Sequence, residues 1–204
     1  MGSSRWPALV LVALSAATPS PALTAPDATP AQTVQDFYDA LTAAMRQGPA
    51  LGFAGRRHML DPMIRRALDL PLMTRLVVGP PWKGLSAPEQ QRLVEAFSDY
   101  SIAVYASRFK EYGGERFIVD PAAARRPNGD VVVSTKLVPK EGETVQLDYL
   151  MRDSARGWQV IDVFLSGTIS ELAARRSEYS AVFRSGGSAA LVDLLIKKTA
   201  EFGS

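Results

Sequence analysis

Few residues in this sequence combine a chemical type with a spacing that catalysis requires. His58 is the only histidine, and Asp61 follows it by one helical turn, so the carboxylate could orient the imidazole as a general base on a continuous helix. Pro62 disfavours such a helix, and Asp61 is better explained as the N-cap of a helix that begins at Pro62. Without cysteine, serine elbow, phosphate loop or metal-spaced cluster, the sequence predicts no catalytic residue, no metal site and no cofactor.

Asp162 is the sharper enzymatic candidate. It alternates with Trp158, Val160 and Phe164, so strict parity places all four on one face of a strand. Desolvation on an apolar face would raise the pKa of the carboxyl, as a general base in an isomerase-type pocket requires, and Tyr149 could donate to an oxyanion. The alternative, which we favour, is that Asp162 anchors a neighbouring backbone group or an arginine.

Four adjacent arginine pairs could bind anionic groups. Guanidinium groups bind phosphate bidentately, so these pairs could hold anionic headgroups or an acidic docking surface. The simpler interpretation, which we favour, is a set of solvated faces, because adjacent residues on a helix do not share a face. The pairs are residues 56–57, 65–66, 125–126 and 175–176.

The first 30 residues are typical of an export signal and a tether. Arg5 precedes an apolar run at 7–17 and small residues, which predicts a secretory signal peptide over 1–25 that is cleaved after Ala22 or Ala25. Residues 26–30 read as a Pro/Ala-rich tether, and 31–204 as a single domain. We therefore expect a mature protein that is soluble outside the cytoplasm; the net charge of +2 gives no reason to expect a nucleic-acid partner.

The periodicity is helical, then strand-like, then helical again. Apolar stripes predict a helix from 34 that is closed by Gly48, others from 62 to 68 and over 70–78, and a long helix that begins with the capping box Ser86 to Glu89 and stops at 113–114. Period-two runs predict four antiparallel strands at 116–120, 131–138, 144–152 and 158–165. A helix capped by Thr168 and a terminal helix after 186–187 complete an α+β domain in which helices cover one sheet face.

Almost the whole mature sequence resembles the MlaC family. The resemblance lies in DFYDALTAAM, DLPLMTRLVVGPPWKGLS, LVEAFSDYSIAVYASRF and VQLDYLMRDSARGWQVIDVFLSGTIS with the trailing RRSEYSAVFRSGG; DLPLMTRLVVGPPW and YASRFKEYGGERF look most like the hopanoid-associated branch, HpnM. The resemblance implies an NTF2-like curved antiparallel sheet wrapped by helices around a hydrophobic cavity. It also implies a periplasmic shuttle that moves hopanoids or phospholipids between inner- and outer-membrane machinery.

A carrier of this kind needs an apolar pocket and no reaction chemistry, so we expect no enzyme activity. A structural periplasmic adaptor with a filled core is the remaining alternative. The apolar stripes of the predicted helices and the alternation of residues along the predicted strands indicate which residues contact the ligand. They are Phe37, Leu72, Leu76, Phe97, Tyr100, Val104, Leu147, Tyr149, Trp158, Val160 and Phe164.

Overall fold

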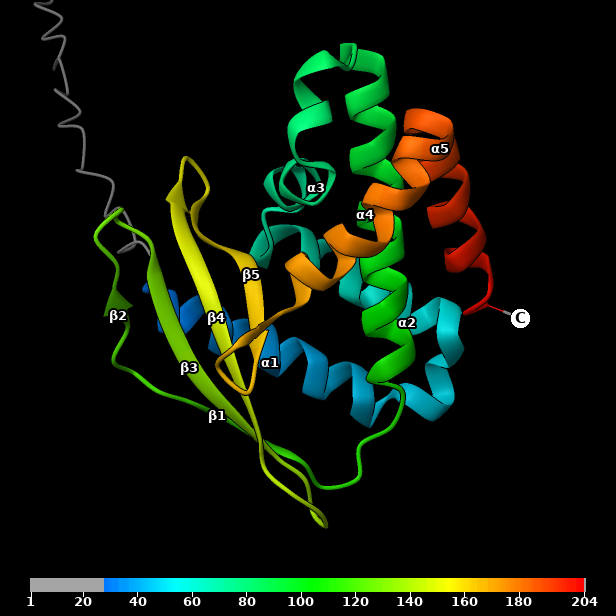
Figure 1. Ribbon diagram of the computed structural model, residues 1–204. Helices are drawn as coiled ribbons and strands as arrows, with labels where there is room; N and C mark the ends of the chain where they lie inside the picture. Colours follow the sequence, from blue (N-terminus) through cyan, green and yellow to red (C-terminus); the bar gives the residue numbers. More distant parts are fainter. Residues whose placement is uncertain (1–27, 204) are drawn as a thin grey trace, which may run out of the picture.

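An antiparallel sheet forms one side of the molecule and the helices cover one of its faces (Figure 1). The structure, a computed structural model, describes residues 28–203, so the predicted signal peptide and the first tether residues lie outside it. The strand order is β1-β3-β4-β5-β6, with β2 paired to β3. The strands are β1 (Arg116–Val119), β2 (Ala124–Arg125), β3 (Val131–Val138), β4 (Val145–Ser154), β5 (Gly157–Leu165) and β6 (Ile169–Ser170). The predicted α+β class is confirmed.

Four helices and a short 3-10 turn precede the sheet, and one long kinked helix follows it. They are α1 (Pro30–Arg46), α2 (Gly48–Ala67), α3 (Leu70–Val78), η1 (Pro80–Gly84), α4 (Ala87–Arg108) and α5 (Glu171–Ala200). The predicted capping box is present, since the backbone N–H and the hydroxyl of Ser86 both donate to Glu89 Oε2, at 2.9 and 2.6 Å. The Thr29 side chain caps α1 and Pro30 opens it, just before residue 31, where the single domain is predicted to begin.

The junction of α1 and α2 differs from the sequence expectation. Gln47 is the C-cap of α1, and Gly48 is the first residue of α2, where a Cβ would lie only 1.8 Å from the Lys110 carbonyl oxygen. Close backbone approach therefore explains this glycine. The predicted helix start at Asp61 and Pro62 is also wrong, because α2 continues through both residues. Pro62 is exposed there, so water can reach the carbonyl that loses its helical donor.

The two predicted C-terminal helices are the two halves of α5, which turn at Gly187, where φ is 68°. The halves fold back on each other (Figure 1), and an ion pair between Glu178 and Lys198 joins them. Ser170 rather than Thr168 caps α5, its hydroxyl accepting from Ala173 N at 2.9 Å. Thr168 instead lies in the turn that lets β6 pair with β5.

A β-bulge in β5 overturns the predicted parity. Met151 of β4 pairs with Val160, but the preceding Leu150 pairs with Asp162, so Ile161 is the extra residue. Cross-strand partners point to the same face of the sheet. From Asp162 onward, the residues of β5 on the face of Met151 and Tyr149 are therefore the odd-numbered ones, whereas before the bulge they are the even-numbered ones. Val163 and Leu165 share the face of Tyr149 and Leu147, whereas Asp162 and Phe164 leave it. Phe164 lies instead beside Arg126, whose guanidinium carbon is 5.8 Å from the ring centroid.

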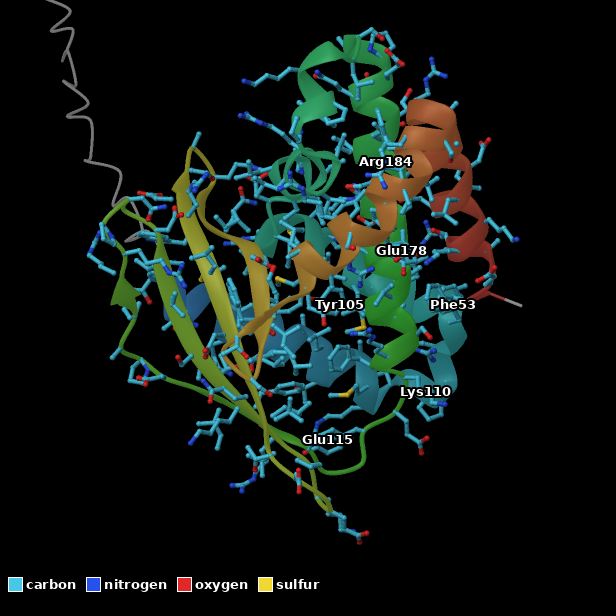
Figure 2. The ribbon with its side chains drawn as sticks, viewed as in Figure 1. Phe53, Tyr105, Lys110, Glu115, Glu178 and Arg184 are labelled. Atoms are coloured by element: carbon cyan, nitrogen blue, oxygen red, sulfur yellow. The ribbon has the colours of Figure 1, made fainter. Side chains whose placement is uncertain are left out.

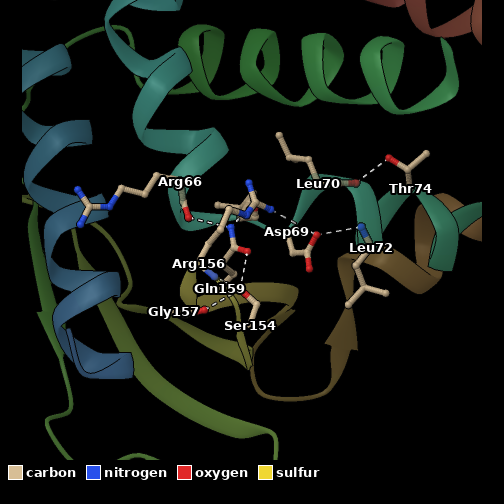
Figure 3. Close-up of polar contacts among 10 residues, drawn as sticks. Arg66, Asp69, Leu70, Leu72, Thr74, Ser154, Arg156, Gly157 and Gln159 are labelled. Atoms are coloured by element: carbon tan, nitrogen blue, oxygen red, sulfur yellow. Dashed lines mark hydrogen bonds and ion pairs between the residues drawn. The ribbon is translucent and has the colours of Figure 1, made fainter. Parts of the chain in front are cut away.

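Polar contacts fix the α2–α3 junction to β5 (Figure 3). Gln159 Nε2 donates to the Arg66 carbonyl at 2.9 Å, and Asp69 N donates to the Val160 carbonyl at 2.9 Å. The Asp69 carboxylate also caps α3 by accepting from Leu72 N at 3.0 Å. These bonds hold α3 over the edge of the sheet, where it forms one wall of the interior.

Candidate functional site

A cavity of about 310 Å³ lies between the helix-facing side of β4 and β5 and the helices α3, α4 and α5. Its size is near the lower end of the range for small-molecule pockets, roughly 300–1,000 Å³. Its apolar lining comprises Leu68, Met73, Phe97, Val104, Phe109, Leu147, Val163, Leu165 and Leu172. Its polar lining comprises Ser101, Tyr105, Arg108, Tyr149, Asp162, Glu171 and Arg175.

Regular periodicity positions most of this lining. The residues from α4 follow one another at 97, 101, 104, 105 and 108, which is a single helical face. Leu147 and Tyr149 alternate on β4 and point the same way, and the bulge brings Val163 and Leu165 onto that side. Tyr105 lies between the sheet and α4 (Figure 2).

Phenols and a phenylalanine close the cavity on the side of α1. Phe37 makes edge contacts with Tyr105 and Tyr149, with ring centroids 5.3 and 6.5 Å apart. Burial raises the pKa of Tyr105 to about 12 and raises that of Tyr149 well above its ordinary value. Both phenols are therefore neutral at physiological pH and add no charge to the cavity.

Asp162 is engaged in holding the start of α5. Its carboxylate accepts from Ser170 Oγ at 2.6 Å, from Val163 N at 2.8 Å and from Leu172 N at 3.2 Å. The side chain is nearly buried, with 9% of the residue exposed. The anchoring role therefore has direct partners, whereas the general-base hypothesis requires a carboxylate whose oxygens are available to a substrate.

Arg175 adds a guanidinium to the polar lining of the cavity. Its Nη1 donates to Tyr100 Oη at 3.3 Å, and its guanidinium carbon lies 5.3 Å from the centroid of the same ring. The carboxylate of Glu171, one turn earlier on α5, is 3.9 Å from Nη2, which exceeds a hydrogen-bonding distance. Arg108, the last residue of α4, supplies the second guanidinium of the lining.

The structure brings four of the eleven predicted ligand contacts to this cavity, namely Phe97, Val104, Leu147 and Tyr149. Their contact with a ligand remains a prediction. Phe37, Trp158 and Val160 pack against or within the core beside it, and Tyr100 lies behind Arg175. Leu72 and Leu76 are on other faces of α3, Leu76 being 39% exposed, and the bulge turns Phe164 away.

Val163, Leu165, Arg108 and Arg175 were missed as lining residues. A strict alternation hides the first two, because the bulge at Ile161 changes the face that β5 presents. Residues 175–176 stand out in the sequence as an arginine pair, but only the helical phase of α5 distinguishes its two members. In the structure Arg175 faces the cavity and Arg176 is exposed.

A second, more open hollow of about 580 Å³ lies along α2 and includes His58 and Asp61. The Asp61 carboxylate accepts from Arg65 Nε at 2.7 Å, one turn further on the same helix. Because this hollow is a surface feature lined by one helix, the internal cavity is the better candidate for a ligand site.

Within residues 28–203, no helix combines the length and the apolar character needed to span a bilayer. In the same part of the chain, no three histidine or acidic side chains come together as a possible metal site.

The comparisons with known proteins agree with this architecture. The family model for the MlaC protein matches residues 35–197, and the chain belongs to the MlaC family. The structure is similar to that of a phospholipid-binding protein from Ralstonia solanacearum, solved in complex with a phospholipid. The two share 25% identity and a TM-score of 0.74, over 87% of this chain and 99% of the other. A search of curated protein sequences gives no match.

Proposed function

We propose that this protein is a periplasmic lipid carrier that takes a hopanoid or phospholipid into the cavity beneath the sheet and moves it between the inner and outer membranes. The observation that carries the proposal is the cavity of about 310 Å³ with its apolar lining from β4, β5 and α3 to α5. Family membership and the structural similarity to a phospholipid-binding protein support it.

Free-energy considerations explain why such a carrier is needed. Exposure to water costs about 0.8 kcal/mol per methylene, so a sixteen-carbon chain that crosses the periplasm alone faces about 12 kcal/mol. A cavity that covers the chain removes most of this cost without acid, base or metal chemistry. The neutral phenols of Tyr105 and Tyr149 are compatible with that task because they bring no charge to the apolar end.

The carrier proposal accounts for the cavity better than either alternative. As a general base, Asp162 would have to release the Ser170 and Leu172 donors that it now accepts. A purely structural adaptor would have no use for an unfilled apolar interior, because cavities destabilise a fold. We accordingly propose a transporter of the inner membrane and lipid machinery of the outer membrane as partners, and no enzymatic reaction.

Lipid extraction from purified protein tests the proposal. The protein is expressed with its export signal in a Gram-negative host, purified without detergent, extracted with solvent and examined by mass spectrometry. We expect co-purifying lipid, and uptake of lipid from vesicles by protein that has been stripped. Protein that is repeatedly empty and takes up no lipid from vesicles would contradict the proposal.

A further inference from the structure

The first half of α5, residues 171–186, forms one wall of the cavity. Glu171, Leu172 and Arg175 contribute to the lining. The opposite face of the same half, at residues 173, 174, 176 and 177, is exposed to solvent. Figure 1 shows this half, in orange, running from the sheet across α4. A single helix therefore separates the cavity from water on this side.

The cavity is small for the ligand of a lipid carrier. Pockets of roughly 300–1,000 Å³ hold drug-sized molecules, and the cavity of about 310 Å³ lies at the lower end of that range. A lipid with two long acyl chains, or a polycyclic triterpenoid, is larger than most such molecules. A wall of the cavity must therefore move if the protein is to cover the whole apolar part of a lipid.

Few buried side chains hold the first half of α5 to the rest of the protein. Leu172 and Tyr179 are its buried residues, whereas α4, beneath it, buries nine. The Tyr179 hydroxyl is buried without a hydrogen-bond partner among the described residues, which disfavours the closed arrangement because water could solvate the group once the helix moves. Segments with little buried apolar contact are the first to open in native proteins.

The polar contacts of this half are concentrated at its start. The Asp162 carboxylate of β5 accepts from Ser170 Oγ at 2.6 Å and from Leu172 N at 3.2 Å. Further along, Arg175 Nη1 donates to Tyr100 Oη at the longer distance of 3.3 Å. The ion pair of Glu178 with Lys198 is partly exposed, so it adds little. The Asp162 bonds are consequently the main latch.

Both ends of the segment have a backbone that can act as a hinge. Ser166 and Gly167, between β5 and β6, have φ values of 51° and 72°, a region that a residue with a side chain such as Ser166 seldom adopts. At the other end Gly187 has a φ of 68°, and no atom lies within 4 Å of the position that a Cβ would take there. Hinges are typically a few loop or terminal residues that absorb such backbone changes.

The geometry points to an entry route for the lipid: residues 168–186 form a lid that swings away from α3 and α4 about hinges at 166–167 and 187 once the bonds of Asp162 to Ser170 and Leu172 break. The sheet and α4 keep their places in this motion. The inference rests on the proposed carrier function and specifies which wall of the cavity yields to the ligand.

Distances between spin labels test which wall moves. The sequence has no cysteine, so pairs of labelled cysteines can be introduced at exposed positions of the otherwise unchanged protein. One pair joins the lid to α2, Ala174→Cys with Ala50→Cys, and the matched control pair joins the sheet to α2, Lys136→Cys with Ala50→Cys. Stripped protein is compared with protein loaded from phospholipid vesicles by pulsed electron paramagnetic resonance.

We expect the distance from residue 174 to residue 50 to increase on loading by about 5 Å, half the width of a helix with its side chains. The distance from residue 136 to residue 50 should stay the same. A change in the sheet pair alone, or no change in either pair although lipid is bound, would overturn the lid. Protein that takes up no lipid at all would instead contradict the carrier function.

Loosening the latch provides a second test. Ser170→Ala removes the hydroxyl that donates to Asp162, and we expect the initial rate of lipid uptake from vesicles to rise about tenfold, as loss of one charge-assisted hydrogen bond allows. Ser180→Ala is the matched control, because that hydroxyl donates to the Arg176 carbonyl within α5, and its uptake rate should equal that of wild type.

Circular dichroism checks that both serine variants are folded. An uptake rate in folded Ser170→Ala that is equal to or below that of wild type would contradict the latch. Should Ser170→Ala fail to fold, the spin-label distances decide, because they leave the Asp162 bonds intact.

Discussion

Replacing Asp162 with alanine should destabilise the protein strongly, because this carboxylate joins β5 to the start of α5. The substitution removes the acceptor of Ser170 Oγ, Val163 N and Leu172 N, at 2.6, 2.8 and 3.2 Å. The general-base hypothesis predicts a different outcome, since a catalytic carboxylate that faces a substrate can often be replaced without loss of stability.

The magnitude follows from the donors that would be left without a partner. A hydrogen bond to a charged group is worth about 1.5–3 kcal/mol, and a buried donor that loses its partner costs a similar amount. Leu172 is buried and Asp162 is 9% exposed, so water replaces the carboxylate poorly. Counting two of the three bonds at full value, we expect Asp162→Ala to lower the free energy of unfolding by about 3–6 kcal/mol, a large part of the roughly 5–15 kcal/mol of a typical domain.

Urea denaturation measures this change, and hydrogen exchange locates it at the amides of Leu172 and Ala173. Asp148→Ala is the matched control: Asp148 is on the neighbouring strand and accepts only from Gln146 among the described residues. Its loss should change the free energy of unfolding by less than about 0.5 kcal/mol. If Asp162→Ala is no more destabilising than Asp148→Ala, the anchoring argument is wrong.

Three further substitutions test separate parts of the structure. Val104→Trp places an indole in the cavity and should reduce lipid uptake from vesicles at least about tenfold without lowering the melting temperature; unchanged uptake would show that lipid binds elsewhere. Asp130→Asn removes the carboxylate that Arg152 binds through two bonds of 2.7 and 2.8 Å, and should cost about 1–2 kcal/mol after allowing for the exposure of the arginine. Because Arg152 lowers the pKa of Asp130, this stabilisation is present above the ordinary carboxyl pKa and is lost as pH falls through the lowered value. Urea titrations of both proteins at several pH values measure the effect. A difference in the free energy of unfolding between wild type and Asp130→Asn that does not change with pH would refute it. Hydrogen bonds from Ser86 and then from Ser188 lower the pKa of Glu89 to about 2, so Glu89→Gln should lower the melting temperature at neutral pH by an amount that shrinks as pH approaches 2. A melting temperature equal to that of wild-type protein at pH 7 would contradict the role of this capping box.

Local sequence signals predicted the regular elements well. The predicted bounds of strand β3, 131–138, are the observed ones. Val131, Val133 and Thr135 alternate with less buried residues, and only one register of the strand buries these three side chains. The capping box gave the start of α4 for an equally local reason. The end of α4 was predicted too late, at 113–114, because the helix stops at Arg108 and an irregular segment leads to β1.

The cavity lining could be predicted only in part, because it depends on tertiary structure. The helical stripe identified Phe97 and Val104, and the parity of β4 identified Leu147 and Tyr149. The bulge at Ile161 shifts the phase of β5 by one residue, so parity counted from Trp158 gave the wrong face from Asp162 onward. No local signal indicates that Phe37 fills the core beside the cavity rather than lining it.

Photo-crosslinking of a bound lipid tests the central claim most directly, because it locates the acyl chain in the protein. Stripped protein is loaded with a phospholipid that carries a diazirine at the end of one acyl chain, irradiated, digested and analysed by mass spectrometry. The carrier account predicts adducts in residues 97–109 and 145–165, which line the cavity, and their loss in Val104→Trp. Adducts confined to residues 53–62 of the open hollow on α2, or an absence of adducts at any loading, would contradict it.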